Sequence, residues 1–188
     1  DATGIGLAIG HARRFDREDL YVELQASHQT GAVIWSLAVG GATKADFRPE
    51  QSVRAGAEHY GKGWYVAGEA AHAEYTAGPV ETLGIRGARD VGAGVRLQAS
   101  AVAVRDENGE DRFGYGLGAV WQTAPRLALE GNWSDAPESS DGMTVDVRSL
   151  VVGATLELSP ELRFRAGVTH EMRQAYDRTE VSIGLART

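Results

Sequence analysis

The chain has 188 residues, a net charge of −7, an isoelectric point near 5.2 and no cysteine. This length suffices for one domain with a full core or for one closed barrel, and we expect residues 1–188 to form a single domain. The acidic charge argues against the basic face that marks a nucleic-acid binder. The lack of cysteine excludes disulfides, thiol catalysis and cysteine-ligated metals, and no run of about 18 apolar residues suggests a transmembrane helix.

A period of two dominates the hydropathy pattern from end to end, and no segment has sustained helical spacing. Turn signals divide this pattern into twelve segments. The predicted strands cover residues 4–14, 19–28, 32–43, 51–60, 64–75, 80–89, 94–105, 112–122, 126–134, 145–158, 161–172 and 179–187. An all-β chain of this kind folds either as a sandwich or as a barrel.

The connections between the predicted strands favour a barrel. Those after even-numbered strands are tight, for example "GKG", "TAPR" and "SPE", whereas most of those after odd-numbered strands are longer and more polar. Short turns at one end and long loops at the other are typical of outer-membrane barrels, and an even strand count then puts both termini in the periplasm. The longest connection, "SDAPESSDGMTVD", either folds inward to restrict a pore or projects outward, and the sequence leaves both open.

Each predicted strand has one apolar side and one polar side. The apolar side is almost free of charge in its middle and carries aromatic residues near strand ends, which match the interfacial girdle of a membrane barrel. The girdle residues are Trp64, Phe113, Trp121 and Trp133, with Phe47 as a further candidate. The pattern therefore predicts a twelve-stranded antiparallel up-and-down transmembrane β-barrel in preference to a soluble β-sandwich.

The polar side mixes acids and arginines with glycine, alanine and serine, and in a barrel these charges would line the lumen. The residues concerned are Glu23, Arg54, Glu58, Glu69, Arg86, Arg96, Glu130, Arg163 and Arg165. If fully paired they would close the bore, because a buried unpaired charge is costly. If partly unpaired and hydrated they would form a lining that sets selectivity. A narrow conduit and a non-conducting anchor or docking barrel thus both remain open.

Two stretches, "EHYGKGWYVAGEAAHAEYTAGPVETLGIRGARDVG" and "YGLGAVWQTAPRLALEGNWSDAPE", resemble Gram-negative outer-membrane β-barrels. More narrowly, they are similar to YaiO-like barrels and to the C-terminal barrels of tetratricopeptide-repeat proteins in exopolysaccharide export and phage adsorption. The likeness lies in the regular succession of strands and turns along nearly the whole chain, without a diagnostic motif. It implies the bacterial outer membrane, with lipid and lipopolysaccharide as surroundings. It also implies passage of a surface polysaccharide or small solutes, or docking of a periplasmic repeat domain or a surface partner.

The resemblance has one departure at the end of the chain. Such barrels usually finish with an aromatic residue that the assembly machinery reads, and this chain stops at "IGLART". Ile183, Leu185 and Arg187 are alternate residues on the outward side, so the next outward position, where such an aromatic residue would stand, is 189. We therefore expect either that the natural chain extends past Thr188 or that its assembly signal is atypical.

Other candidate chemistry is weaker. His72 and Glu74 share one side of a strand and would suit a general base, but no serine stands near them in a convincing motif, so we do not expect an enzyme. The acids of "RDENGEDR" (105–112) offer oxygen ligands for calcium, yet their spacing does not match the calcium-binding loop. A solvated turn with a type I′ Asn108-Gly109 pair fits better. We expect no cofactor.

Overall fold

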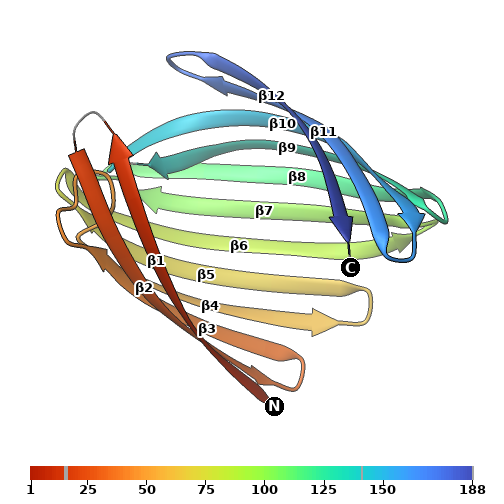
Figure 1. The fold of residues 1–188 in the computed structure, drawn as a ribbon, viewed down its shortest axis with the longest axis horizontal. Coiled ribbons are helices and arrows are strands. Elements are labelled where there is room, and N and C mark those ends of the chain that lie inside the picture. Colours follow the sequence, from red (N-terminus) through yellow and green to blue (C-terminus); the bar gives the residue numbers. More distant parts are fainter. Residues whose placement is uncertain (15–16, 141, 188) are drawn as a thin grey trace.

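The computed structural model describes residues 1–14, 17–140 and 142–187, in which every regular element is a strand (Figure 1). The strands are β1 (Ala2–Arg14), β2 (Arg17–Thr30), β3 (Val33–Ala42), β4 (Gln51–Gly61), β5 (Trp64–Tyr75), β6 (Gly78–Gly92), β7 (Val95–Arg105), β8 (Asp111–Ala124), β9 (Leu127–Ser140), β10 (Met143–Ser159), β11 (Leu162–Arg173) and β12 (Asp177–Arg187). No helix in this part of the chain is long and apolar enough to cross a membrane.

The strands form one antiparallel sheet in which each strand pairs with the next along the chain, from β1 to β12. The predicted twelve-stranded up-and-down architecture is confirmed. The sheet curls on itself, with β4 to β9 at the back of Figure 1 and β1 and β12 towards the viewer. Within the described ranges β1 pairs only with β2 and β12 only with β11, so the curled sheet stays open along a seam between its first and last strands.

The strands are strongly staggered. A line of directly paired residues that starts at Ala2, next to the short-turn end of β1, passes through Glu58 in β4. The same line continues through the later strands and arrives at Arg178, at the long-loop end of β12. A stagger of this kind is what tilted strands need in order to close into a barrel.

The β9–β10 hairpin is longer than predicted. The sequence predicts that these strands stop near residue 134 and resume at 145, whereas β9 continues to Ser140 and β10 begins at Met143. Most of the predicted long loop is therefore strand. Pro137 is tolerated in it because the pairing of β9 with β8 ends at Asp135, which leaves one side of β9 without a ladder.

Large apolar side chains lie on the outside of this sheet. Phe113 is 80% exposed and Ile183 is 75% exposed, and most other large apolar residues of the strands are also exposed. The buried apolar residues are mostly small or β-branched ones, such as Ala38, Ala67 and Val104. The molecule is thus apolar outside and has only a thin core, the reverse of a soluble β-sandwich.

Candidate functional site: the inner face of the barrel

Residues directly opposite one another in a sheet point to the same face, so the register assigns each side chain to one of two faces. One face carries large apolar residues such as Leu7, Leu37 and Leu117. The nine charged residues predicted to line the lumen all lie on the other face. They are Glu23, Arg54, Glu58, Glu69, Arg86, Arg96, Glu130, Arg163 and Arg165.

Contacts across non-adjacent strands identify this charged face as the concave one. Arg54 Nη2 in β4 lies 3.5 Å from Glu23 Oε2 in β2, and Arg86 Nη2 in β6 lies 2.8 Å from Glu58 Oε1 in β4. Each pair reaches over an intervening strand, a separation of about 9.6 Å between backbones. Side chains converge over that distance on the inside of a curve, so this face is the inner one.

The pair formed by Glu23 and Arg54 belongs to a polar network near the long-loop end. Tyr21 Oη donates a hydrogen bond to Glu23 Oε2 at 3.1 Å and lies 3.0 Å from Ser52 Oγ. Gly40 lies beneath Tyr21, and a side chain there would meet the Tyr21 hydroxyl at 2.5 Å from its Cβ. The glycine therefore leaves room for Tyr21 to reach across β3 to β4.

Two further inner pairs lie towards the short-turn end. Arg96 Nε lies 2.6 Å from Asp90 Oδ1 across β6 and β7, and Arg163 Nε lies 3.4 Å from Glu157 Oε1 across β10 and β11. Both pairs join directly opposite residues. They are about half exposed, so each contributes little to stability.

Three of the nine inner residues have no ion pair or hydrogen bond with another side chain in the described part of the chain. They are Glu69 in β5, Glu130 in β9 and Arg165 in β11, and all three are exposed. Gly153 lies directly against Glu130, where a Cβ would come within 2.6 Å of Oε1. The absence of a side chain at Gly153 therefore makes room for the Glu130 side chain.

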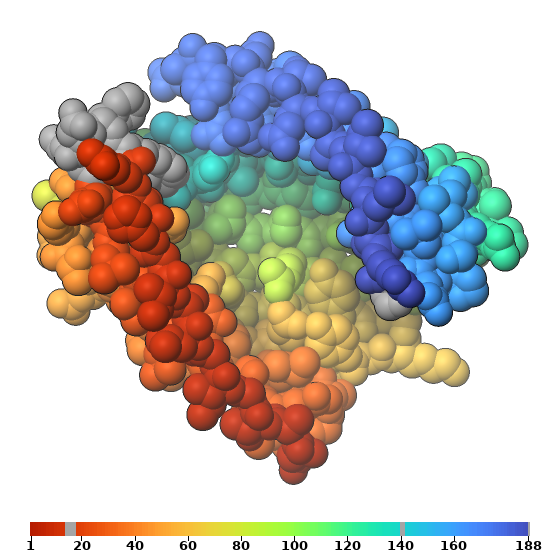
Figure 2. All heavy atoms as spheres, in the orientation of Figure 1, coloured from red at the N-terminus to blue at the C-terminus, as the bar shows by residue number. Residues whose placement is uncertain are grey.

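The inner face is hollow beside Glu69. One hollow of about 410 Å³ is lined by residues that include Gly6, Gln25, Arg54 and Glu69. A second, of about 200 Å³, includes Glu69 and the Glu58–Arg86 pair. Figure 2 shows the interior as a depression between the first and last strands. The two hollows meet at Glu69, which supplies a free carboxylate to both.

The apolar outer face ends at ion pairs on the long-loop side. Arg105 lies 3.6 Å from Asp111 across β7 and β8, and Arg148 lies 2.8 Å from Asp135 across β9 and β10. Between the Arg105–Asp111 pair and the short turn, the outward positions of β7 from Val95 to Ala103 carry no charge. That stretch has the length of about 9–11 residues that a tilted strand needs to cross a bilayer.

The predicted girdle residues lie at the limits of this apolar face. Trp64 is the first residue of β5, while Phe113 and Trp121 lie towards the two ends of β8. Trp133 is at mid-strand rather than at the strand end that the sequence predicts, because β9 continues past it. It is nevertheless the last apolar outward residue before Asp135, and it contacts Tyr115 edge-on with ring centroids 5.4 Å apart.

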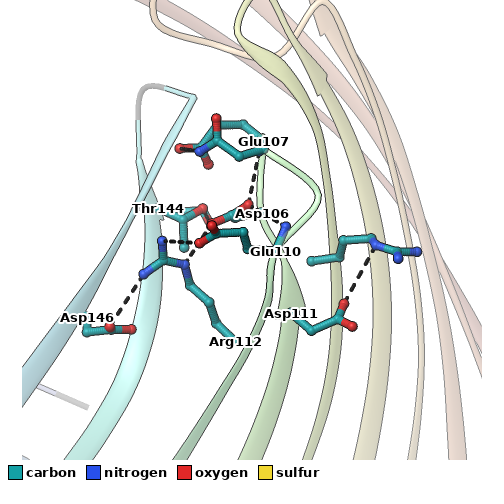
Figure 3. Close-up of polar contacts among 10 residues, drawn as sticks. Asp106, Glu107, Glu110, Asp111, Arg112, Thr144 and Asp146 are labelled. Atoms are coloured by element: carbon teal, nitrogen blue, oxygen red, sulfur yellow. Dashed lines mark hydrogen bonds and ion pairs between the residues drawn. The ribbon is translucent and has the colours of Figure 1, made fainter.

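The connection between β7 and β8 is organised by Asp106, as Figure 3 shows. The backbone N–H groups of Asn108 and Glu110 donate to Asp106 Oδ1, and Arg112 Nε donates to Oδ2 at 2.7 Å. Positive φ occurs at Gly109 and not at Asn108, so the predicted type I′ pair is wrong. Arg112 holds the pKa of Asp106 below its ordinary value with help from the two N–H groups, although burial opposes them.

The other candidates for chemistry lie apart from the inner face. In the described ranges no group of three or more His, Asp or Glu residues is arranged to hold a metal ion. Within 105–112, Asp106 and Glu110 engage Arg112, Asp111 engages Arg105, and Glu107 accepts from the Asn108 side chain. His72 Nε2 lies 3.1 Å from Glu74 Oε1, and His72 Nδ1 lies 3.7 Å from Glu81. These residues belong to the charged rim of the outer face, where His72 in β5 is opposite Glu81 in β6 and Glu74 is two residues further along β5.

Sequence reasoning did not single out Asp19, which is fully buried. Its carboxylate accepts hydrogen bonds from the backbone N–H groups of Asp46, Phe47 and Arg48. Phe47 therefore belongs to an inward-held loop instead of the strand-end girdle. The sequence did contain a signal for it. Asp19, Tyr21 and Glu23 are alternate residues of one strand, so Asp19 could have been expected to point inward with the other two.

The twelve staggered strands, the apolar outer face and the charged inner face together define an outer-membrane β-barrel fold. No protein-family model matches the chain, and no curated protein matches it in sequence.

Among solved structures, the chain is similar to the KdgM porin at 8% identity and a TM-score of 0.50, covering 100% of this chain and 99% of the porin. A KdgM porin in complex with disordered oligogalacturonate gives 8% identity, a TM-score of 0.48 and the same coverage. The siderophore receptor PirA from Pseudomonas aeruginosa is 12% identical to the chain, with a TM-score of 0.42. The match covers 99% of this chain and 40% of PirA. The likeness to the first structure concerns the fold. None of the three is a YaiO-like or tetratricopeptide-repeat barrel, so that narrower resemblance stays a prediction.

Proposed function

We propose that this protein spans the bacterial outer membrane as a narrow passive conduit for small polar solutes. In this proposal the exposed apolar face contacts membrane lipid and, beyond its charged rim, lipopolysaccharide. The nine inner charges form the lining of the conduit.

The observation that carries the proposal is the set of unpaired inner charges, one of which, Glu69, lies beside hollow space. A non-conducting anchor would need its inner charges paired, because an unpaired charge in a dry interior is costly. Glu69, Glu130 and Arg165 have no ion pair within the described residues, and glycine, serine and alanine surround much of the inner surface. Three unpaired charges on the inner face, one of them beside two hollows, favour a hydrated lining.

The direct test is conductance of the refolded protein in planar lipid bilayers. We expect discrete current steps in salt solution, and no current above the lipid background would contradict the conduit and leave the anchor. Passage of a surface polysaccharide, the other cargo predicted from the sequence, needs the same open lumen. Liposome swelling with sugars of increasing size distinguishes a polysaccharide pore from a small-solute conduit, because the small-solute conduit admits only the smallest sugars.

The membrane location has a separate test. The exposed apolar face would drive association in water, so the protein should require detergent or lipid to remain folded and monodisperse. A folded monomer in detergent-free buffer would contradict the membrane location.

A further inference from the structure

The longest connection between described strands is the β3–β4 loop, residues 43–50, and it folds over the inner face instead of projecting away from it. Two inward side chains of β2, Asp19 and Tyr21, contact it from the lumen side. The loop therefore reaches the lumen side of β2 at the mouth of the barrel, at the long-loop end.

Asp19 holds this loop by three consecutive backbone groups. The N–H of Asp46 donates to Asp19 Oδ1 at 2.8 Å, and those of Phe47 and Arg48 donate to Oδ2 at 2.7 Å each. Hydrogen bonds to a charged carboxylate are roughly twice as strong as neutral ones, and Asp19 is fully buried. One inward carboxylate thus fixes the position of the loop.

The rest of the loop is anchored to its neighbours. Lys44 Nζ pairs with Glu18 Oε1 at 2.8 Å, and Thr76 Oγ1 in the β5–β6 turn donates to the carbonyl of Ala45 at 3.1 Å. Ala45 is buried and has a φ of 55°, a conformation that costs a non-glycine residue about 1–3 kcal/mol. Such a conformation persists where surrounding contacts determine it, so the loop has a defined, inward-held structure.

The consequence of this anchoring is the position of Arg48. Its guanidinium lies over the Tyr21 ring, 5.8 Å from the centroid, on the lumen side of β2. Arg48 is exposed and has no ion pair within 4 Å of a described residue, and its one charge partner is the buried Asp19, at longer range. By contrast, Arg112, Arg173 and Arg178, which face inward at the same end, have carboxylate oxygens at 2.7, 2.6 and 3.1 Å.

We propose that Arg48, held over the mouth of the lumen by Asp19, is a specificity-determining residue that favours entry of anionic solutes. This inference rests on the proposed conduit. A free cation at a pore mouth raises the local concentration of anions, and in water a unit charge about 8 Å from an ion changes that concentration roughly twofold.

The loop anchoring is tested without any current, by hydrogen exchange of the protein in detergent. In the wild type the amides of Asp46, Phe47 and Arg48 should be protected. Asp19→Ala should accelerate their exchange by at least about tenfold, as expected when a hydrogen bond worth roughly 1.5–3 kcal/mol is lost, while mid-strand amides of β2 stay protected. Unchanged exchange of the three amides in a folded Asp19→Ala variant would overturn the anchoring.

The role of Arg48 is tested by reversal potentials across a salt gradient. Arg48→Gln should lower the anion-to-cation permeability ratio roughly fourfold, because the local concentration of anions falls about twofold and that of cations rises about twofold. The matched control is Arg13→Gln, which removes the same charge at the same end from an outward position of β1, and it should leave the ratio unchanged.

The outcomes separate this inference from the function on which it rests. A conducting wild type whose ratio is the same in Arg48→Gln would overturn the role of Arg48 while leaving the conduit intact. A wild type that carries no current would contradict the conduit and the role of Arg48 together. Amide exchange then still decides whether Asp19 anchors the loop.

Discussion

Asp135 and Arg148 face each other across β9 and β10 on the outer face, with Arg148 Nε 2.8 Å from Asp135 Oδ2. The next outward pair towards the short turns is Trp133 with Leu150, and below it the face is apolar. The ion pair therefore marks where the apolar face stops, although both strands continue beyond it. In a membrane this boundary would separate hydrocarbon from the aqueous side.

The apolar face yields a prediction at neighbouring residues of β10. Val152 points outward and is 56% exposed, opposite Gly131 and Val168. Val152→Arg should lower the free energy of unfolding in lipid vesicles by about 2–4 kcal/mol, the cost of an arginine facing the middle of a bilayer. Urea titration followed by tryptophan fluorescence measures this change.

Val151 provides the matched control, because it lies one position away and points to the inner face, opposite Asn132 and Thr169. Val151→Arg should cost clearly less than Val152→Arg, since its guanidinium would reach the hydrated lumen. Equal costs at the two positions would contradict the assignment of the two faces to lipid and water.

The two faces could be predicted from the sequence because side chains of a strand alternate strictly. Once the apolar phase of a strand is recognised, as from Leu7 in β1, Leu37 in β3 and Leu117 in β8, every other residue of that strand is assigned to a face. The same phase applies to Glu69 and Arg165, which is why all nine candidate residues fall on one face. Which of them pair was not predictable, since the Glu23–Arg54 contact depends on curvature that brings β2 and β4 together.

The features that sequence reasoning missed depend on contacts between distant segments. The approach of Arg48 to Asp19 requires the β3–β4 loop to turn inward, and no local signal in "ADFRPE" specifies that direction. Pro137 suggested a loop because proline has no backbone N–H to donate to a neighbouring strand. In the structure β8 no longer pairs with β9 at this position, so no hydrogen bond to β8 is lost. Gly109 signalled a turn correctly, and its type was set by the three contacts of Asp106.

Arg165 gives a prediction about ion selectivity. It faces inward in β11, opposite Gly184, and has no ion pair within the described residues. Arg165→Gln should lower the anion-to-cation permeability ratio of the conducting protein roughly fourfold, because removal of one free charge near the ion path changes the concentrations of anions and cations about twofold in opposite directions. Reversal potentials across a salt gradient measure the ratio.

Arg187 is the control for this measurement. It lies near the same end of the barrel but points outward, opposite Leu162. Arg187→Gln removes the same charge from the outer face and should leave the ratio unchanged. Equal shifts in the two variants would indicate a general charge effect and count against Arg165 as a lining residue.

Asp106 gives a prediction about pH. Because the pKa of its carboxyl is held below the ordinary value in the folded turn, its contribution to local stability is present above the ordinary pKa. That contribution is lost as the pH falls through the folded pKa. The amides of Asn108 and Glu110 should therefore lose protection on strong acidification, after correction for the intrinsic exchange rate.

Asp106→Asn should remove this pH dependence, because the side chain no longer titrates. Asp111→Asn is the matched control, since Asp111 is exposed and pairs with Arg105 at 3.6 Å on the outer rim. It should leave the pH profile of the Asn108 and Glu110 amides as in the wild type. If the protection of these amides still depends on pH in Asp106→Asn, a titrating group other than Asp106 determines the stability of the turn.

The free edges of β1 and β12 give the last prediction. Unpaired backbone groups are costly in hydrocarbon, and membrane barrels close for this reason. The two strands run in opposite directions. Because the line of paired residues that starts at Ala2 ends at Arg178, the start of β12 lies near the C-terminal end of β1. In a membrane we therefore expect β1 and β12 to pair with each other as antiparallel neighbours.

Cysteine pairs test this closure against a background without cysteine. Ser182 points inward, as do Ala8, Gly10 and Ala12. Ser182→Cys should form an intramolecular disulfide with a cysteine at one of these three positions in lipid vesicles. A cysteine at Ile9, which points outward, should not link, because the two Cβ atoms would lie on opposite faces. Links only between separate molecules would show that the edges pair with a second copy instead.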